Sequence, residues 1–301
     1  MAPGPDTATI RRFNRSYTQR IGALDESFLG VGLPLGAARL LFEIGAEVTT
    51  AQRLRARLGL DSGYLSRLLR QLEAARFVVV EPDPGDRRRR VVRLTGSGHA
   101  TWRRLDARSE RLARRLVEPL TDRQRARLTE ALATADLLVR AATVQLETTD
   151  PADPMARSAV GHYVAELDRR FPEGFDPGPA TDAEAAAMRA PNGCFVVATS
   201  DGEPVACGGL QTIAPGVGEI KRMWVHEGWR GAGLGSRMLR RLEQEARDRG
   251  LPVVRLDTNS ALTEAIEMYD RAGYRAIERY NDNPYARHWF EKELSGRPGQ
   301  H

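Results

Sequence analysis

Apolar residues in the first half of the chain recur with the period of a helix. The clearest case lies in the stretch 49–77, where four leucines fall at positions i, i+3, i+4 and i+7 and share one face. These are Leu65, Leu68, Leu69 and Leu72. Thr50 can cap a shorter helix that ends near Gly59, and Asp61 or Ser62 can cap the helix that follows. Two helices joined by about three residues predict a helix-turn-helix.

Two β-branched runs follow and predict a hairpin. The segment FVVVEPDPGDRRRRVVRLT (77–95) has apolar residues on both sides of a polar tip. The tip carries four consecutive arginines, Arg87, Arg88, Arg89 and Arg90. A charged turn is usually only solvated, but four guanidinium groups beside a helix-turn-helix favour a wing that lies along a phosphate backbone.

Beyond residue 150 the pattern changes to short β-type runs that alternate with helical segments. Five runs predict strands: CFVVAT (194–199), PVACGGL (204–210), EIKRMWV (219–225), PVVRLDT (252–258) and ARHWFEKEL (286–294). Asp201-Gly202 between the first two is typical of a hairpin turn. The segment ETTDPADPM (147–155) separates the two patterns, so we expect one domain over residues 1–149 and a second over residues 150–301.

Composition limits the class of protein. The 301 residues are 41% hydrophobic and 28% charged, which is ordinary for a globular protein and argues against disorder or a fibre. No apolar run approaches the roughly 20 residues of a membrane helix, and the segment MAPGPDTATIRRFNRSY lacks the apolar stretch of a secretory signal. Cys194 and Cys207 form no metal-ligand or redox spacing. We expect a cytoplasmic protein with no membrane partner and no metal.

Charge is divided unevenly along the chain. Residues 1–150 hold 26 basic and 18 acidic residues, a net charge of +8, whereas residues 151–301 hold 19 basic and 22 acidic residues, a net charge of −3. Only Lys221 and Lys292 are lysines, so the first half is basic through arginine alone. Codon bias alone could produce this preference. Arginine also suits phosphates and guanine edges, and one-sided basicity indicates a polyanionic partner.

Residues 49–98, with the two helices and the segment DPGDRRRRVVRLTGSG, resemble the winged helix-turn-helix of the MarR family of bacterial regulators. The resemblance extends over about residues 8–145 and implies a mainly α-helical domain. It implies a homodimer whose arms, residues 8–29 and 100–145, intertwine and which binds a double-stranded DNA operator. The residues expected to face DNA are Ser62, Tyr64, Ser66, Arg67 and Arg70 of the second helix and Arg87, Arg88, Arg89 and Arg90 of the wing.

A glycine-rich segment, EGWRGAGLGSRM (227–238), joins a predicted strand to a predicted helix. Such a turn directs several backbone N–H groups at one point near the positive end of a helix dipole, which suits a phosphate. The Walker pattern requires a lysine that is missing here, and the dinucleotide fingerprint fails because Met238 stands at its third glycine position. The pattern from Arg230 to Gly235 resembles the pyrophosphate loop of GNAT acyltransferases, which use acetyl-CoA.

The GNAT resemblance covers about residues 155–294 and implies an α/β (α+β) fold with a mixed, mostly antiparallel sheet. It also implies that a backbone N–H of a splayed central strand, that of Met223, polarises the thioester carbonyl. The residues expected to hold acetyl-CoA are Met223, Trp224, Val225, Arg230, Gly231, Ala232, Gly233, Leu234, Gly235, Ser236, Asn259 and Tyr269. Asn259 is expected to bind the pantetheine amide.

Two side chains match catalytic positions of the family. Tyr269 corresponds to the general acid toward the leaving sulfur, although its helical spacing from Leu262 and Ile266 is equally typical of a core residue. Glu219 matches a carboxylate that acts as base, often through a water, although a carboxylate at a strand edge is usually only solvated. Strand alternation predicts that Met223 shares a side with Glu219.

The acceptor pocket is expected to involve four residues of the second domain, Arg222, Asn283, Tyr285 and His288. The leading hypothesis is a fusion of a DNA-binding regulator with an N-acetyltransferase that acts on a small primary amine by direct transfer in a ternary complex. In one alternative the second domain only senses acetyl-CoA. In the other the winged helix only dimerises the enzyme.

Overall fold

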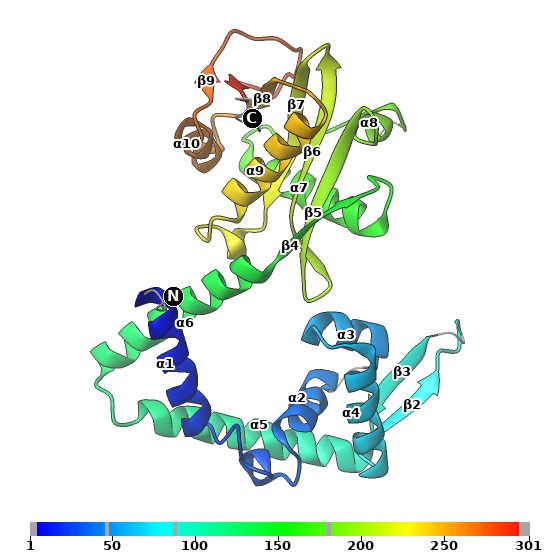
Figure 1. Ribbon diagram of the computed structural model, residues 1–301, viewed down its shortest axis with the longest axis vertical. Helices are drawn as coiled ribbons and strands as arrows, with labels where there is room; N and C mark the ends of the chain where they lie inside the picture. Colours follow the sequence, from blue (N-terminus) through cyan, green and yellow to red (C-terminus); the bar gives the residue numbers. More distant parts are fainter. Residues whose placement is uncertain (1–4, 46–47, 87–88, 179–181, 295–301) are drawn as a thin grey trace, which may run out of the picture. The chain divides into compact units, whose positions relative to one another are not determined.

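The computed structural model describes residues 5–45, 48–86, 89–178 and 182–294 (Figure 1). The chain divides into two compact units, Met1–Ala131 and Leu132–His301. The second unit thus begins inside helix α6 (Asp122–Thr143), before the expected boundary between residues 149 and 150. The reason is packing, since Ala141 and Val144 are buried in the core of the second unit and β4 (Gln145–Thr149) joins its sheet.

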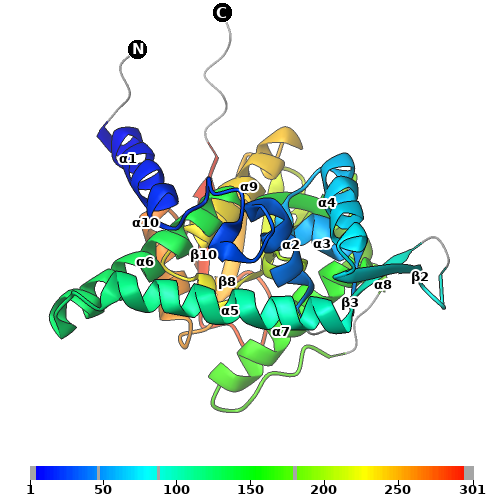
Figure 2. The same cartoon turned by 90° about the horizontal axis from the view of Figure 1, so that it is seen from below.

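The N-terminal unit consists of helices and one small sheet. Its elements are α1 (Pro5–Arg20), η1 (Phe28–Gly30), α2 (Leu35–Ile44), β1 (Thr49–Thr50), α3 (Ala51–Leu58), α4 (Ser62–Ala74), β2 (Val78–Pro82), β3 (Arg90–Leu94), α5 (Gly96–Val117) and the first part of α6. The sheet order is β1-β3-β2. The hairpin β2–β3 extends beyond α3 and α4 in both views (Figures 1 and 2).

Local sequence signals explain where α3 and α4 begin and end. The Thr50 side chain accepts a hydrogen bond from the Arg53 N–H, and Gly59 ends α3 in the left-handed conformation. Asp61 caps α4, because its carboxylate accepts from the Tyr64 N–H at 2.8 Å. All four leucines of the α4 stripe are buried, so the predicted helix-turn-helix is confirmed.

The C-terminal unit is built on a seven-stranded sheet in the order β4-β5-β6-β7-β8-β10-β9. Besides β4 its elements are α7 (Pro154–Arg170), α8 (Asp182–Ala187), β5 (Gly193–Ser200), β6 (Glu203–Ala214), β7 (Val217–Val225), η2 (Glu227–Trp229), α9 (Leu234–Asp248), β8 (Val253–Thr258), α10 (Thr263–Arg271), β9 (Arg275–Ala276) and β10 (His288–Glu293). Among the described strands only β7 and β8 pair in parallel, with α9 as their crossover. The expected mixed, mostly antiparallel sheet is confirmed.

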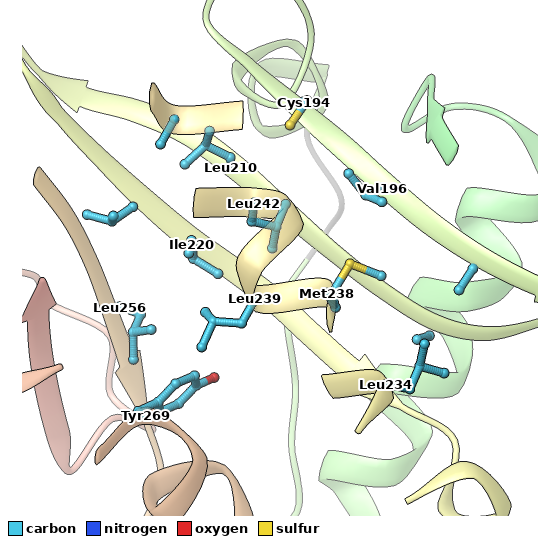
Figure 3. Close-up of a cluster of buried hydrophobic side chains, with 14 of the residues drawn as sticks. Cys194, Val196, Leu210, Ile220, Leu234, Met238, Leu239, Leu242, Leu256 and Tyr269 are labelled. Atoms are coloured by element: carbon cyan, nitrogen blue, oxygen red, sulfur yellow. The ribbon is translucent and has the colours of Figure 1, made fainter. Parts of the chain in front are cut away.

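The two faces of this sheet carry separate apolar clusters. Helix α9 covers one face, where Leu234, Met238, Leu239 and Leu242 pack against strand residues such as Leu210 (Figure 3). Helix α7 covers the other face and contributes Ala156 and Ala159 to a smaller cluster that includes Trp224. Both helices present an apolar stripe to a sheet whose side chains alternate between the faces.

Strand β7 contains a bulge that reverses this alternation. Arg222 has φ 54°, and the register with β6 shifts between Cys207 and Gly209. As a result Met223 packs in the same cluster as Ile220, on the α9 face. The prediction that Met223 shares a side with Glu219 was therefore wrong, because alternation holds only where the ladder is uninterrupted.

Strands β7 and β8 also separate. Their pairing covers only Val217–Glu219 against Val253–Arg255. Beyond Glu219 the edge of β7 that faces β8 has no strand partner within the described part of the chain. Backbone N–H and C=O groups along that edge are available to a ligand.

Candidate functional site

A pocket of about 510 Å³ lies where the free end of β7 meets the glycine-rich segment, α7 and α10. Its lining comprises Glu166, Arg170, Met223, Trp224, Val225, Trp229, Arg230, Gly231, Gly233, Leu234, Gly235, Ser236, Leu262, Glu264, Ala265, Met268, Tyr269 and Arg271. Every residue expected to hold acetyl-CoA is in this lining except Ala232 and Asn259. Residues from distant parts of the chain therefore converge on the predicted loop.

The three glycines of the loop serve two different purposes. Gly231 and Gly233 have φ of 78° and 77°, which side-chain-bearing residues rarely adopt, and a Cβ on either would meet nothing within 4 Å. Gly235 is helical, and its Cβ would lie 3.1 Å from the Met268 sulfur of α10. The first two shape an open turn at the start of α9, and the third lets two helices approach.

The start of α9 is suited to an anion. Gly233 is its N-cap residue and offers no side chain to cap the first turn. The first N–H groups of a helix have no partner within the helix and carry the positive end of its dipole. These donors lie at the lining of the pocket, which is the geometry of a phosphate site.

Four charged side chains form an ion cluster at one side of the pocket, and sequence analysis missed it. Arg170 of α7 donates to both carboxylate oxygens of Glu264, at 2.8 Å for Oε2, and to Glu166 at 3.3 Å. Arg230 also donates to Glu166 and lies 3.6 Å from Glu264. The hydrogen bonds from Arg170 lower the pKa of Glu264 to about 2. The i,i+4 spacing of Glu166 and Arg170 was a signal for one pair only.

Tyr269 belongs to both the core and the pocket. It is 5% exposed, and its ring contacts Tyr274 and Phe290 at centroid distances of 5.8 and 5.9 Å. Figure 3 shows the ring beside Leu239. Burial, assisted by the negative charge of Asp257, raises the pKa of Tyr269 above its usual value of 10.0, so the phenol is protonated at neutral pH.

Glu219 is not a solvated strand-edge carboxylate. It is 3% exposed and accepts hydrogen bonds from Gln211 Nε2 at 2.6 Å, Tyr280 Oη at 2.9 Å and Asn281 Nδ2 at 3.1 Å. Lys221 Nζ lies 3.6 Å away. Donors therefore occupy both carboxylate oxygens of Glu219. Glu219 is not among the residues that line the described pocket.

A second carboxylate shares this network. Asn281 Nδ2 also donates to Asp257 at 2.5 Å, and Asn283 Nδ2 donates to the other Asp257 oxygen at 2.9 Å. The asparagines of the segment before β10 thus bridge carboxylates from β7 and β8. No sequence pattern indicated this link, because the three segments meet only in the folded sheet.

The residues expected to bind the acceptor do not converge on the described pocket. Arg222 donates to Glu184 at 3.2 Å, and Tyr285 packs against Phe175 at a centroid distance of 4.7 Å. His288 on β10 is hydrogen-bonded to Ser260 at 3.0 Å. Only Asn283 joins the carboxylate network.

Asn259 holds its own loop together. Its Nδ2 donates to the Tyr285 carbonyl at 2.6 Å, and its Oδ1 accepts from the Ala261 N–H at 2.9 Å. Ala232 packs against the apolar core beneath the loop. Neither residue is part of the described pocket lining.

In the N-terminal unit, a groove of about 340 Å³ brings α4 together with the wing. Ser62 and Ser66 line it opposite Arg89 and Arg90, and α3 adds Gln52 and Arg55, which sequence analysis missed. Both side chains are exposed on α3. Arg87 and Arg88 lie outside the described residues.

The other residues of α4 that were expected to face DNA lie along the helix. Arg70 Nε donates to the Ser66 carbonyl at 3.4 Å, and the Arg67 guanidinium lies 5.2 Å from the Tyr64 ring centroid. The Tyr64 hydroxyl lies against Gly36 of α2, where an added Cβ would be 2.6 Å from it. Packing against the unit's own core therefore occupies much of the Tyr64 side chain.

Within the described residues, no group of His, Cys, Asp and Glu side chains could hold a metal ion. No helix within the described ranges is long and apolar enough to cross a bilayer.

Comparison with known proteins identifies both units. Residues 162–274 match the acetyltransferase (GNAT) family model, and residues 31–89 match the MarR family model. A protein of Azospirillum brasilense named IAA acetyltransferase is 32% identical over 119 residues, which are 39% of this chain and 78% of that protein.

Solved structures are similar to each part separately. A GNAT-family acetyltransferase from Staphylococcus aureus Mu50 is 15% identical, with 51% of this chain and 100% of that chain covered and a TM-score of 0.46. A mutant of MarR from E. coli, in complex with operator DNA, is 25% identical, with 42% and 91% covered and a TM-score of 0.36. The chain belongs to the GNAT acetyltransferase family through its C-terminal unit, and its N-terminal unit matches the MarR family model over residues 31–89.

Proposed function

We propose that this acetyltransferase transfers the acetyl group of acetyl-CoA directly to a small primary amine in a ternary complex, and that its N-terminal half binds an operator as a homodimer. The observation that carries the enzymatic part is the open turn at Gly231 and Gly233, which faces a pocket beside the unpaired edge of β7. The residues present fit an acyl-CoA, since N–H donors suit a diphosphate and a free strand edge suits the amides of pantetheine.

In this proposal each part of the pocket has one task. The backbone from Arg230 to Ser236, with Val225, holds the diphosphate, and Trp224 and Leu234 form walls. The N–H of Met223, placed by the bulge on the free stretch of β7, donates to the thioester oxygen as negative charge develops there. Fixing the thioester beside the acceptor lowers the entropic part of the barrier.

The chemical step requires a neutral amine and a protonated leaving sulfur. The amine nitrogen attacks the thioester carbon, so that a C–N bond forms and the C–S bond breaks with its electron pair on sulfur. Tyr269, which burial keeps protonated, donates its proton to that sulfur. The proton lost by the amine passes through a water to Glu219, the proposed base, which Tyr280 and Asn281 hold in place.

Acceptor recognition is proposed for Arg222, Asn283, Tyr285 and His288, of which Asn283 joins the carboxylate network. Asn259 contributes by holding the loop that carries Ala261 and bonding the Tyr285 backbone. A small primary amine is the proposed acceptor, because amide synthesis needs only a neutral nitrogen to reach the thioester.

The proposed dimer is supported by apolar residues that the chain itself leaves exposed. Ile10, Phe13 and Tyr17 of α1 are 59%, 48% and 44% exposed and form a stripe along the helix. A helix of this length is marginal in water without packing. Leu132, Leu138 and Val139 of α6 are also exposed, which fits arms that intertwine with a second copy.

Isothermal titration calorimetry with coenzyme A on the full chain tests the enzymatic proposal. We expect saturable heat, and CoA release when an amine panel is then supplied with acetyl-CoA. Absence of heat would remove the transferase proposal. Tight acetyl-CoA binding without CoA release for any amine would instead favour the alternative in which this unit only senses acetyl-CoA.

A further inference from the structure

Three arginines line the coenzyme pocket, and two of them, Arg170 and Arg230, share the same pair of carboxylates. Arg170 and Arg230 line the pocket together with the glycine-rich turn. Their partners Glu166 and Glu264 line it as well, so two positive and two negative side chains lie at one wall. A diphosphate at the turn would add further negative charge beside this neutral cluster.

The two carboxylates are held very differently. The Glu166 side chain is 9% exposed and also accepts from Trp224 Nε1 at 2.8 Å, so it is fixed from three sides. The Glu264 side chain is 47% exposed and is held by arginines alone among the described side chains. It stands in the first turn of α10, at the open side of the cluster. Glu264 is therefore the partner that can leave.

Arg170 would keep its place without Glu264. Its Nη2 donates to the Ala261 carbonyl at 2.8 Å, and its Nη1 donates to Glu166 at 3.3 Å. These two contacts hold the guanidinium at the pocket wall. Arg230 is likewise held by Glu166 and by the Val225 carbonyl at 3.3 Å. Two guanidinium groups fixed at one wall form a ready site for phosphate oxygens.

We propose that Glu264 is a built-in competitor of the coenzyme: it occupies Arg170 and Arg230 in the free protein, and the diphosphate displaces it from them on binding. This inference rests on the proposed function, since it concerns the same pocket. It adds Arg170, from a helix outside the glycine-rich segment, as a coenzyme-binding residue. It also makes Glu264 a residue that weakens affinity and so limits retention of the product coenzyme.

The test is calorimetry on the full chain with Glu264→Gln and a matched control. Glu293→Gln removes the same charge from β10, where exposed Glu293 lies 3.7 Å from exposed Arg275 and neither residue lines the described pocket. We expect Glu264→Gln to tighten coenzyme A binding by about fivefold and Glu293→Gln to change it by less than about twofold. Equal effects of the two variants, or weaker binding by Glu264→Gln, would overturn the proposal.

Ligand fragments identify the competing group. Dephospho-coenzyme A keeps the diphosphate and should show the same gain, whereas pantetheine, which has no phosphate, should show none. A gain for pantetheine would mean that Glu264 acts on pocket shape, and a gain for coenzyme A alone would assign the competition to the 3′-phosphate. Either result contradicts displacement by the diphosphate.

Arg170→Met provides an independent check that does not depend on Glu264→Gln alone. It should weaken coenzyme A binding, and in the double variant Glu264→Gln should no longer improve it, because the two residues act through one contact. Additive effects would refute the coupling. Binding of coenzyme A to the wild-type protein is measured first. Absence of binding would refute the proposed function. If the wild type binds and the variants have the same affinity, only this inference is refuted.

Discussion

Tyr269 lies where the pocket meets the apolar core. Its burial packs the ring into the core and also raises the pKa of its phenol. Its ring packs between Tyr274 and Phe290, so removal of the hydroxyl leaves the packing intact. Gly231 and Gly233 contribute through the backbone and not through a side chain, because their positive φ angles form the turn. Tyr269 is thus suited to the chemical step, and Gly233 to binding of the coenzyme.

Two substitutions separate these tasks. Tyr269→Phe should lower kcat by about 10- to 100-fold, less than a full general-acid effect because water can replace the donor, with little change in acetyl-CoA affinity. Gly233→Val should chiefly abolish affinity, since a β-branched residue cannot adopt φ 77° without strain. Steady-state kinetics together with calorimetry measure both, and equal losses of affinity would contradict the division.

The raised pKa of Tyr269 predicts the alkaline behaviour of the enzyme. Because the folded protein stabilises the protonated phenol, this contribution to stability is complete below the unfolded value of about 10 and is lost as pH rises beyond it. We expect kcat to show no decline from Tyr269 below pH 10. A falling limb between pH 7 and 9 that vanishes in Tyr269→Phe would show that the phenol ionises early.

Helices α4 and α1 differ in what covers their apolar faces. Helix α4 buries its leucine stripe and turns Ser62 and Ser66 toward the groove shared with the wing. Helix α1 has no comparable buried face among its described residues, and its apolar stripe is exposed. The leucine face of α4 is therefore covered within one chain, whereas the apolar stripe of α1 is left exposed among the described residues.

Arginines of α4 should control DNA affinity. Substituting Arg67 and Arg70 with Ala should weaken binding to the protein's own promoter region and reduce the slope of affinity against salt, because fewer counterions are released. Fluorescence anisotropy over a salt series measures this. Arg114→Ala, another exposed arginine that is paired with Glu110 on α5, is the control. Unchanged affinity in the α4 variant would favour the alternative in which the winged helix only dimerises.

The exposed stripe of α1 should hold the dimer together. Phe13→Glu places a charge in the stripe and should shift the protein toward monomer in sedimentation velocity, because burying an unpaired carboxylate is costly. Gln19→Glu adds the same charge on the side of α1 opposite the stripe, where Gln19 is exposed, and serves as the control. A monomeric wild-type protein would contradict the proposed dimer at once.

The whole molecule contains separate apolar cores that serve separate functions. Leu72 belongs to the core of the winged helix and Leu242 to the core beneath the sheet, and both are fully buried. Each leucine packs with neighbours of its own cluster. A substitution that destabilises one core should therefore leave the function of the other unit intact.

Leu72→Ala and Leu242→Ala test this independence. Each should destabilise its own unit by about 2–5 kcal/mol, the usual cost of truncating a buried leucine. We expect Leu72→Ala to impair DNA binding while coenzyme A binding persists, and Leu242→Ala to do the reverse. Thermal unfolding with and without coenzyme A provides the measurement. Loss of both functions from either substitution would show that the units are energetically coupled.

Patterns between neighbours in the chain were sufficient to predict the two families, a cap at Thr50, a second cap at Asp61 or Ser62, the leucine stripe of α4 and the glycine-rich turn. These features depend on local backbone preferences and on periodicity, which the sequence carries explicitly. Most of the predicted coenzyme residues lie close together in the chain, so the pocket around them was foreseeable.

Contacts between distant segments were decided only by the tertiary structure. The bulge at Arg222 moves Met223 to the face of the sheet opposite Glu219. In the ion cluster, Arg170 links Glu166 to Glu264, which lies far from it in the sequence. Glu219 has its donors because three strands and a loop meet there. Register and long-range pairing depend on how whole elements pack, and hydrophobic periodicity contains no information about which charged side chains will then meet.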